Sequence, residues 1–268
     1  MLFTRHSNSN KGDHGSLAVV GGAKGTVGAA FLAARTALYS GCGRVFVVRP
    51  DLNDGVLLDP LQPELMFISF ADAAHKPITA WAIGPGLGLS ETAHQILSSV
   101  LASPLPVVID ADALNLMAEH PALGRQCARR DAPTVMTPHP GEAGRLLGVS
   151  TEEIQSNREE AAKKLQQQFK AIVVLKGAGT IITTQGNRVK NTTGNAALAT
   201  GGTGDVLTGL IGALIAQGLP AFDAAVTGTR LHGLAAENLT IKIGGMIGVT
   251  ASELIPEIRG LICNNNSQ

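Results

Sequence analysis

The strongest constraint on the fold of this chain is the repeated alternation of short apolar runs with longer helix-like segments. Short apolar runs that end in glycine or aspartate are typical of strands buried on both faces of a sheet. The expected strands are 16–22, 44–48, 80–86, 106–112 and 171–177, and the expected helices are 28–40, 91–101, 141–147, 152–168 and 205–217. Because crossover helices between parallel strands cover both faces, the pattern predicts an α/β fold around a central parallel sheet.

The segment TIITTQGNRVKN, residues 180–191, departs from this pattern. Two short β-prone stretches flank Gln-Gly-Asn, which predicts an antiparallel hairpin. No internal repeat, charge block or linker divides the 268 residues, so we expect a single domain spanning 1–268. Its ends, 1–11 and 264–268, are expected to be flexible.

Composition excludes several classes of function. Lysine plus arginine equals aspartate plus glutamate at 21 each, so no net charge favours nucleic acid or an anionic membrane as a partner. Cys42, Cys127 and Cys263 are widely spaced and form no C-x-x-C pair, which argues against a disulfide framework and a structural zinc site. The N-terminus is polar and the longest apolar run is too short to span a bilayer, so we expect a cytoplasmic protein.

Two glycine-rich turns follow expected strands. The first, GGAKGTVGAA at 21–30, matches neither the P-loop nor the G-x-G-x-x-G fingerprint, and tight packing explains it as well as a ligand does. The second, GPGLG at 84–88, would let the backbone approach a bound group, although a plain loop is the simpler reading. Neither turn assigns a function by itself.

Acidic residues follow the strand at 106–109. Asp110 and Asp112, with Asn115 nearby, have the spacing of a metal or hydroxyl site. The simpler reading of Asp112 is a cap on the helix that follows, and we favour it.

A histidine and a lysine also follow expected strands. In TPHPGE, residues 137–142, two prolines fix the backbone around His139, and a capping box with Glu142 would require Ser or Thr at 139. A rigid turn with a surface histidine remains the alternative. Lys176 ends an apolar strand in LKGAGT, where burial requires an anionic partner. Phosphate and an acidic side chain both satisfy that requirement.

The segment ATGGTGDVLTG, residues 199–209, is the most informative motif. Glycines 201, 202 and 204 precede an apolar helix whose first N–H groups are unpaired, which favours anion binding. Asp205 carries negative charge where an anion would bind, so we interpret it as a base beside the anion rather than as a helix cap. This arrangement predicts phosphoryl transfer.

Taken together, the motifs resemble those of the NAD(P)H-hydrate dehydratases, a family of the ribokinase-like superfamily. NTTGNAALATGGTGDVLTG carries the resemblance most narrowly, and the others occur in the family's order: KGDHGSLAVVGGAKGTVGAA, AIGPGLG, DADALN, TPHPGEAGRLLG and VVLKGAGT. The resemblance extends from Lys11 to the last helix and implies a three-layer α/β/α sandwich with a mostly parallel sheet and a small antiparallel hairpin. Many bacterial members are fused behind an epimerase domain. None is visible here, so we expect the NAD(P)H-hydrate epimerase to be a separate functional partner.

The resemblance also implies an activity. The S epimer of NADHX or NADPHX would be phosphorylated on its hydroxyl by ADP and would then eliminate phosphate, giving AMP, phosphate and NADH or NADPH. The resemblance implies that Ala29, Gly88 and His139 contact the hydrate, and that Asp205 is the base on the hydrate hydroxyl. The residues that it places on ADP or AMP are Lys176, Gly177, Ala178, Gly179, Thr180 and Gly204. Magnesium is expected without assigned ligands, with Glu142 through water as the candidate contact. A homo-oligomer, specifically a tetramer, is expected from the family.

Two alternatives belong to other classes. A small-molecule kinase of the same superfamily, acting on a vitamin-precursor alcohol, would share the G-T-G-D element, but TPHPGE together with KGAGT argues against it. A catalytically inactive nucleotide-binding regulator would not need Asp205.

Overall fold

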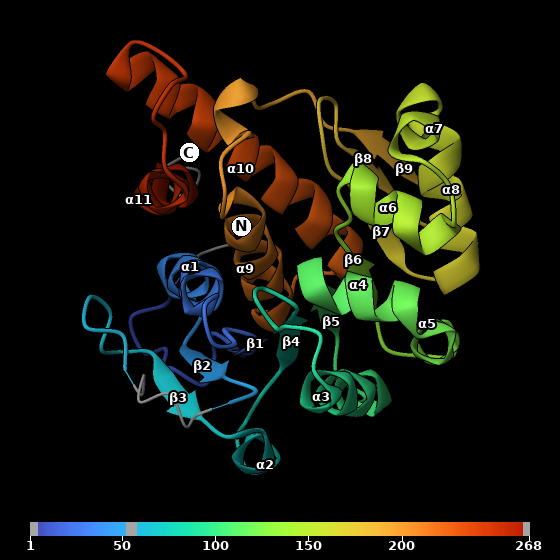
Figure 1. The fold of residues 1–268 in the computed structure, drawn as a ribbon. Coiled ribbons are helices and arrows are strands. Elements are labelled where there is room, and N and C mark those ends of the chain that lie inside the picture. The colour runs from blue at the N-terminus through green and yellow to red at the C-terminus, as the bar shows by residue number, and fades with distance from the viewer. Residues whose placement is uncertain (1–4, 52–57, 265–268) are drawn as a thin grey trace.

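The computed structural model describes residues 5–51 and 58–264, and these form a nine-stranded sheet in the order β3-β2-β1-β4-β5-β6-β7-β8-β9 (Figure 1). The strands are β1 Ser16–Val20, β2 Arg44–Val48, β3 Met66–Ile68, β4 Ala80–Ile83, β5 Val107–Ile109, β6 Thr134–Met136, β7 Ile172–Leu175, β8 Ile181–Thr183 and β9 Arg188–Lys190. β1 to β7 pair in parallel, whereas β8 and β9 add an antiparallel hairpin at one edge. The predicted mostly parallel sheet and hairpin are confirmed.

Helices cover both faces of the sheet. One face carries α1 Val27–Tyr39, α9 Thr203–Ala216, α10 Ala221–Ile243 and α11 Ala251–Asn264. The other carries α2 Phe70–Ala73, α3 Glu91–Ala102, α4 Ala111–Glu119, α5 Pro121–Cys127, α6 Pro140–Leu147, α7 Thr151–Ser156 and α8 Arg158–Phe169. The predicted three-layer sandwich is therefore confirmed.

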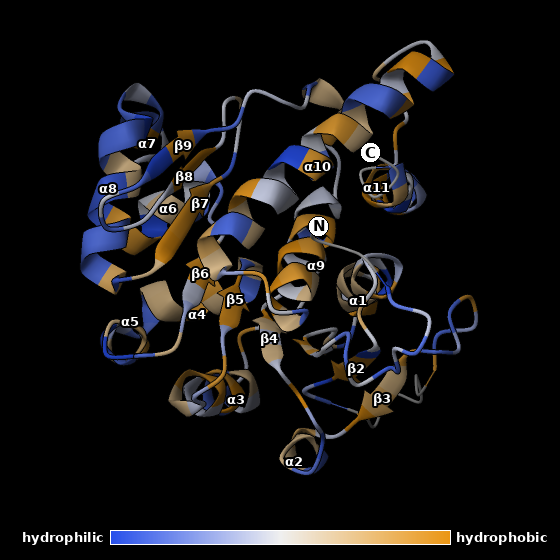
Figure 2. Cartoon of the chain, turned by 180° about the vertical axis from the view of Figure 1, so that it is seen from behind, coloured by the Kyte–Doolittle hydropathy of each residue, from blue (hydrophilic) through white to orange (hydrophobic). Residues whose placement is uncertain are grey.

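Each face of the sheet has its own hydrophobic core. Along β1, Leu17 and Val19 belong to the core under α9, while Ala18 and Val20 belong to the opposite core, as strand alternation requires. Twelve of the fourteen residues of α9 are buried, and this helix is predominantly orange in Figure 2, whereas α7 and α8 carry much blue. Full burial of a leucine or isoleucine contributes roughly 1.5–3 kcal/mol, so α9 is anchored firmly behind the motif at its start.

Several boundaries differ from the predictions. The expected helix 152–168 is two helices that meet at Asn157, whose side chain accepts a hydrogen bond from the Glu160 amide and caps α8. The helix expected from Asp205 begins at Thr203. Strands β3 and β6, of three residues each, were not predicted.

The order of the strands reverses between β1 and β4, whose connections run to opposite sides of the sheet. In open α/β sheets, ligands bind in the crevice outside the carboxyl ends of the strands at such a point. Of the ends predicted to be flexible, residues 1–4 and 265–268 lie outside the described residues, while Arg5 donates a hydrogen bond to the Gly41 carbonyl. Over the described ranges, no helix is long and apolar enough to cross a membrane.

Candidate active site

A cavity of about 920 Å³ lies at the carboxyl ends of β5, β6 and β7, beside the start of α9. Eight predicted site residues line it: His139, Lys176, Gly177, Ala178, Gly179, Thr180, Gly204 and Asp205. The two other predicted residues, Ala29 and Gly88, do not line it. They lie in the neighbouring segments that follow β1 and β4.

Lys176 has an acidic partner within the protein. Its Nζ donates a hydrogen bond to Asp110 Oδ1 at 2.7 Å, and Asp110 Oδ2 accepts one from the Thr208 hydroxyl at 2.7 Å. Asp110 is 1 % exposed and the Lys176 side chain is 19 % exposed. Burial acts to lower the pKa of Lys176, but the charges of Asp110 and Glu142 outweigh it, so the pKa is raised. The ammonium is therefore held charged within an internal ion pair.

His139 begins α6 as its N-cap. Its Nδ1 accepts hydrogen bonds from the amides of Gly141 and Glu142, at 3.0 and 3.3 Å, and Glu142 Oε2 accepts one from the His139 amide at 2.8 Å. This is a capping box, so the expectation that only Ser or Thr at 139 would form one was wrong. The imidazole supplies a lone pair where a hydroxyl oxygen normally does. Since Nδ1 accepts, the proton of the neutral ring lies on Nε2, which is 3.3 Å from Glu142 Oε1.

Two carboxyl groups at this site are poised near neutrality. Burial raises the pKa of Asp205 to about 7, and the negative charge of Asp110 adds to the effect while Lys176 opposes it. Burial likewise raises the pKa of Glu142 to about 7, although Lys176 lowers it. A general base works best with a pKa close to the operating pH, so Asp205 is suited to that role.

The start of α9 leaves the Asp205 carboxylate open to the cavity. The N-cap is Gly202, with φ +89°, and Asp205 follows in the first turn without capping the helix. A Cβ on Gly202 would lie 2.5 Å from the side chain of Leu32, so only glycine fits this turn. A Cβ on Gly204 would lie 3.2 Å from Lys176 Nζ. The glycines thus keep the amides of the first turn accessible to an anion.

The loop after β9 forms another wall of the cavity and is fastened along α10. The Thr193 hydroxyl donates to the Arg230 carbonyl at 3.0 Å, the Gly194 amide to Glu237 Oε1 at 2.7 Å, and the Asn195 amide group to the Thr240 hydroxyl at 3.0 Å. At its other end, the Asn191 amide donates to the Thr180 carbonyl at 2.8 Å. The contacts with α10 were not predicted, because the partners are 37, 43 and 45 residues apart and nothing local in the sequence indicates the pairing.

His232 is a further site residue that the sequence motifs missed. It lies on α10 in the cavity wall, is 6 % exposed, and its Nε2 has no hydrogen-bond partner among the described residues. Burial lowers its pKa to about 4, so the ring is neutral.

The segments after β1 and β4 form a second region at the same edge of the sheet. The Gly22 amide donates to the Pro85 carbonyl at 3.0 Å and the Ala23 amide to the Gly86 carbonyl at 2.7 Å. The Gly88 amide donates to Asp112 Oδ2 at 2.8 Å. Asp112 therefore holds a neighbouring loop, and its favoured reading as a helix cap was wrong, because α4 already begins at Ala111.

Within the described ranges, no cluster of three or more histidine, cysteine, aspartate or glutamate side chains could hold a metal ion. Asp110 and Asp112 also have separate partners, so their spacing does not produce a protein-only metal site. Magnesium usually binds through one or two carboxylates together with substrate phosphates, and Glu142, whose Oε2 lies 4.0 Å from Lys176 Nζ in the cavity, is close enough to contribute one of them through water.

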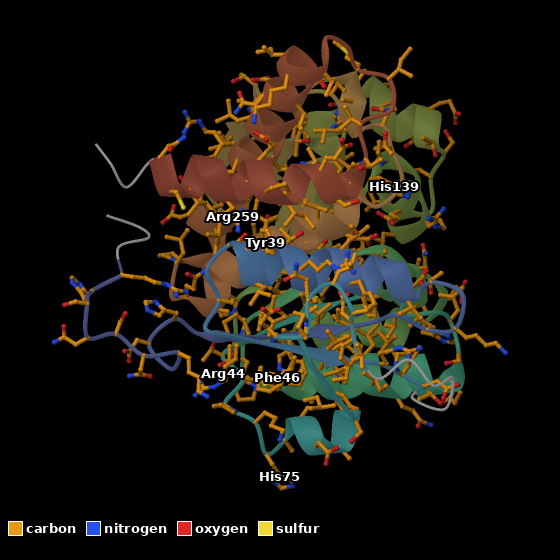
Figure 3. The ribbon with its side chains drawn as sticks, turned by 90° about the vertical axis from the view of Figure 1, so that its left-hand side faces the viewer. Tyr39, Arg44, Phe46, His75, His139 and Arg259 are labelled. Atoms are coloured by element: carbon orange, nitrogen blue, oxygen red, sulfur yellow. The ribbon has the colours of Figure 1, made fainter. Side chains whose placement is uncertain are left out.

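Another cavity, of about 1060 Å³, lies elsewhere and contains none of the predicted site residues. Tyr39 and Arg259 belong to its lining, with the guanidinium carbon 4.7 Å from the centre of the tyrosine ring. Figure 3 shows this pair well apart from His139.

The NAD(P)H-hydrate dehydratase family model matches residues 17–259, which include both loop regions and the whole cavity. The chain belongs to the NAD(P)H-hydrate dehydratase family.

Two relatives illustrate the range of this family. The chain is 42 % identical over 263 residues to an ADP-dependent (S)-NAD(P)H-hydrate dehydratase of Neisseria meningitidis serogroup B, covering 96 % of this chain and 88 % of the relative. It is 40 % identical over 266 residues to the bifunctional NAD(P)H-hydrate repair enzyme Nnr of Escherichia coli K12, covering 97 % of this chain. It spans about half the length of that bifunctional relative.

Solved structures agree with this assignment. An ADP/ATP-dependent NAD(P)H-hydrate dehydratase from Bacillus subtilis, co-crystallised with ATP and Mg²⁺, has a TM-score of 0.84 at 33 % identity, covering 98 % of this chain and 94 % of that one. A ribokinase-like superfamily protein from Enterococcus faecalis V583 has a TM-score of 0.85 at 28 % identity, covering 98 % and 92 %. The ribokinase-like fold of the dehydratase family is thereby confirmed.

Proposed function

We propose that this chain is an ADP-dependent (S)-NAD(P)H-hydrate dehydratase that returns NADHX and NADPHX to NADH and NADPH. The observation that carries the proposal is the open carboxylate of Asp205 at the glycine-rich start of α9, in one cavity with the loop Lys176 to Thr180. Membership of the dehydratase family supports this substrate over that of a vitamin-precursor kinase.

The proposed reaction has two steps. Asp205 accepts the proton of the hydrate hydroxyl, and the hydroxyl oxygen bonds to the β-phosphorus of ADP as the bond to the bridging oxygen breaks and AMP leaves. The ring nitrogen then donates its electron pair while the bond between the ring carbon and the phosphorylated oxygen breaks, and phosphate leaves with that oxygen. Loss of the neighbouring ring proton restores the double bond of NADH or NADPH, so one ADP is converted to AMP and phosphate for each hydrate repaired.

The residues divide between two ligands in this proposal. Lys176, Gly177, Ala178, Gly179, Thr180 and Gly204 bind ADP or AMP, and the first-turn amides of α9 stabilise the transferred phosphoryl group. The hydrate lies between Asp205 and His139 and extends toward Ala29 and Gly88. The reversal of strand order between β1 and β4 supports this division, because it opens the crevice that such a long ligand requires.

Magnesium is part of the proposal. Glu142, through water, is the carboxylate that would hold it beside the phosphates of the nucleotide. Bound there, the ion would neutralise charge on the phosphoryl oxygens.

The proposal extends to the setting of the enzyme. We place it in the cytoplasm as a homo-oligomer, a tetramer as expected from the family, with ADP and the hydrates as its ligands. An NAD(P)H-hydrate epimerase would be its functional partner, which is supported by the relatives that are named as bifunctional NAD(P)H-hydrate repair enzymes.

Product stoichiometry tests the proposed function. The protein is incubated with NADHX and Mg²⁺ plus either ADP or ATP, while the absorbance of reduced nicotinamide is followed and the products are separated by chromatography. We expect NADH, AMP and phosphate to form in equal amounts with ADP, and only slow nucleotide hydrolysis without the hydrate. A persistent phosphorylated organic product would instead indicate a kinase, and recovery of NADH without nucleotide cleavage would exclude the mechanism.

A further inference from the structure

The charged side chains of the cavity do not balance a bound nucleotide as they stand. Among the described residues that line it, Asp110 and Asp205 are acidic and Lys176 and Lys190 are basic. The charge of Lys176 is already matched by Asp110 at 2.7 Å, with Glu142 at 4.0 Å on its other side. A nucleoside diphosphate brings several negative charges into a cavity that already contains Asp205, so a positive side chain other than Lys176 would favour its binding in addition to the proposed magnesium ion.

Lys190 is suited to supply that charge. It ends β9, is exposed and lines the cavity, and its ammonium group has no ion pair or hydrogen bond with another described residue. By contrast Arg188, two residues earlier on β9, pairs with Glu159 at 2.7 Å and does not line the cavity. Strand β9 thus carries one cation in an ion pair, Arg188, and one without an ion pair to a described residue, Lys190.

The loop of the nucleotide side is shaped around the Lys190 side chain. A Cβ on Gly179 would lie 2.7 Å from Lys190 Cε and 3.7 Å from its Nζ, so the absence of a side chain at Gly179 leaves room for the lysine. Lys190 pairs with Ile181 across the β8–β9 hairpin, and the next amide, that of Asn191, donates to the Thr180 carbonyl. The backbone pairing on both sides of Lys190 therefore places this residue beside the loop Lys176 to Thr180, and its exposed side chain lies next to Gly179.

We propose that Lys190 supplies the unmatched positive charge that binds the phosphates of the donor nucleotide beside the loop Lys176 to Thr180, since the charge of Lys176 is already matched by Asp110. This inference rests on the proposed use of ADP. Lys190 thereby sets the preference for a diphosphate over a monophosphate, because its contribution grows with the charge of the bound phosphate chain.

Calorimetric titration of ADP, AMP and adenosine tests the inference on the wild type and on Lys190→Met, Lys190→Arg and Arg188→Met. A charge-assisted hydrogen bond is worth roughly 1.5–3 kcal/mol, so Lys190→Met should weaken ADP about 10- to 100-fold. We expect a smaller loss for AMP and none for adenosine, and a weaker dependence of ADP affinity on salt. Lys190→Arg should keep most of the affinity. Arg188→Met, the matched control, should bind ADP within about twofold of the wild type because its charge lies outside the cavity.

Two results would overturn the inference. One is unchanged ADP affinity in Lys190→Met, and the other is an equal loss for ADP, AMP and adenosine, which would assign Lys190 to the base or to the shape of the wall. If the wild type binds no ADP, the proposed function fails and this inference fails with it. If instead the wild type and Lys190→Met bind ADP with the same affinity, only this inference fails and the proposed function stands.

Discussion

The cavity beside α9 and the paired loops after β1 and β4 share one edge of the sheet but are built differently. In the cavity, side chains determine the chemistry, since Asp110, Lys176 and Asp205 hold opposite charges in a largely buried setting. In the paired loops the backbone determines the shape, and a Cβ on Gly21 would lie 2.0 Å from the Pro85 carbonyl oxygen. Substitutions that remove a charged side chain should therefore harm the cavity most. Substitutions that add a side chain at a glycine should harm the paired loops most.

Asp205→Asn, a substitution in the cavity, should have the largest effect on kcat. Loss of the base should lower kcat by about 10²- to 10⁴-fold while calorimetric ADP affinity is largely kept. The folded state binds the Asp205 proton more tightly than the unfolded chain, so stability is lost as the pH rises from the ordinary pKa of 3.8 to about 7, and the loss is complete above about 7. Above pH 7 the free energy of unfolding of the variant should therefore exceed that of the wild type by roughly 1–3 kcal/mol, and the variant should unfold at a higher temperature.

Asp223→Asn, which removes an exposed carboxylate at the start of α10, is the matched control. It should change neither kcat nor the free energy of unfolding appreciably. Turnover close to that of the wild type in Asp205→Asn would remove this residue from the chemistry.

Lys176→Met tests whether the cavity depends on its internal ion pair. Removing the ammonium leaves Asp110 buried with only the Thr208 hydroxyl, so the free energy of unfolding should fall by about 3–5 kcal/mol. The uncompensated carboxylate should also repel ADP more than AMP. Chemical denaturation and calorimetry measure the two effects, with the exposed Lys163→Met as control. A fully stable variant would show that the ion pair contributes little.

The pH dependence of kcat/KM should reflect the cavity rather than the loops. Since Asp205 acts only when deprotonated and burial raises its pKa to about 7, kcat/KM should fall about tenfold for each pH unit below that value and level off above it. Initial rates are measured at each pH, and the rate at which the hydrate reacts without enzyme is subtracted. In Asp205→Asn the residual rate should lose this dependence, and a wild-type profile flat well below neutrality would contradict the assignment.

Gly88→Ala addresses the loops directly. The glycine has φ +74° and a Cβ there would lie 3.4 Å from that of Ala23, so the change should cost about 1 kcal/mol of stability and weaken the hydrate several-fold. ADP affinity should not change. Gly186→Ala carries a similar positive φ, +97°, in open space and controls for strain alone. Equal losses of hydrate affinity in both variants would show that the effect is not local.

His139→Ala should give the smallest effect and tests the boundary between the two regions. Loss of the cap should cost about 1 kcal/mol of stability, and hydrate affinity should fall more than ADP affinity. His139→Asn retains a capping side chain, so it should recover stability without recovering the hydrate. If it restores both, His139 acts only by fixing the turn.

The sequence predicts features that are contiguous and fails where topology supplies the partner. The motif around Asp205 is interpretable because its glycines, its carboxylate and its apolar helix are adjacent, and the hairpin is predicted because its turn is local. The partner of Lys176 was left open because Asp110 is 66 residues away and only the strand order brings them together. His139 was misread as unable to cap, since the rule for capping boxes is statistical and an imidazole nitrogen also accepts hydrogen bonds.

The fastening of Thr193, Gly194 and Asn195 along α10 has a consequence for conformational entropy. An irregular loop normally retains many backbone conformations, and ordering each residue costs roughly 1–2 kcal/mol. Here that ordering is completed when the chain folds, because the loop is bound to a helix that also packs against α9 and α11. A ligand that enters the cavity meets a wall that is already ordered, so its binding free energy is not reduced by the cost of ordering this segment.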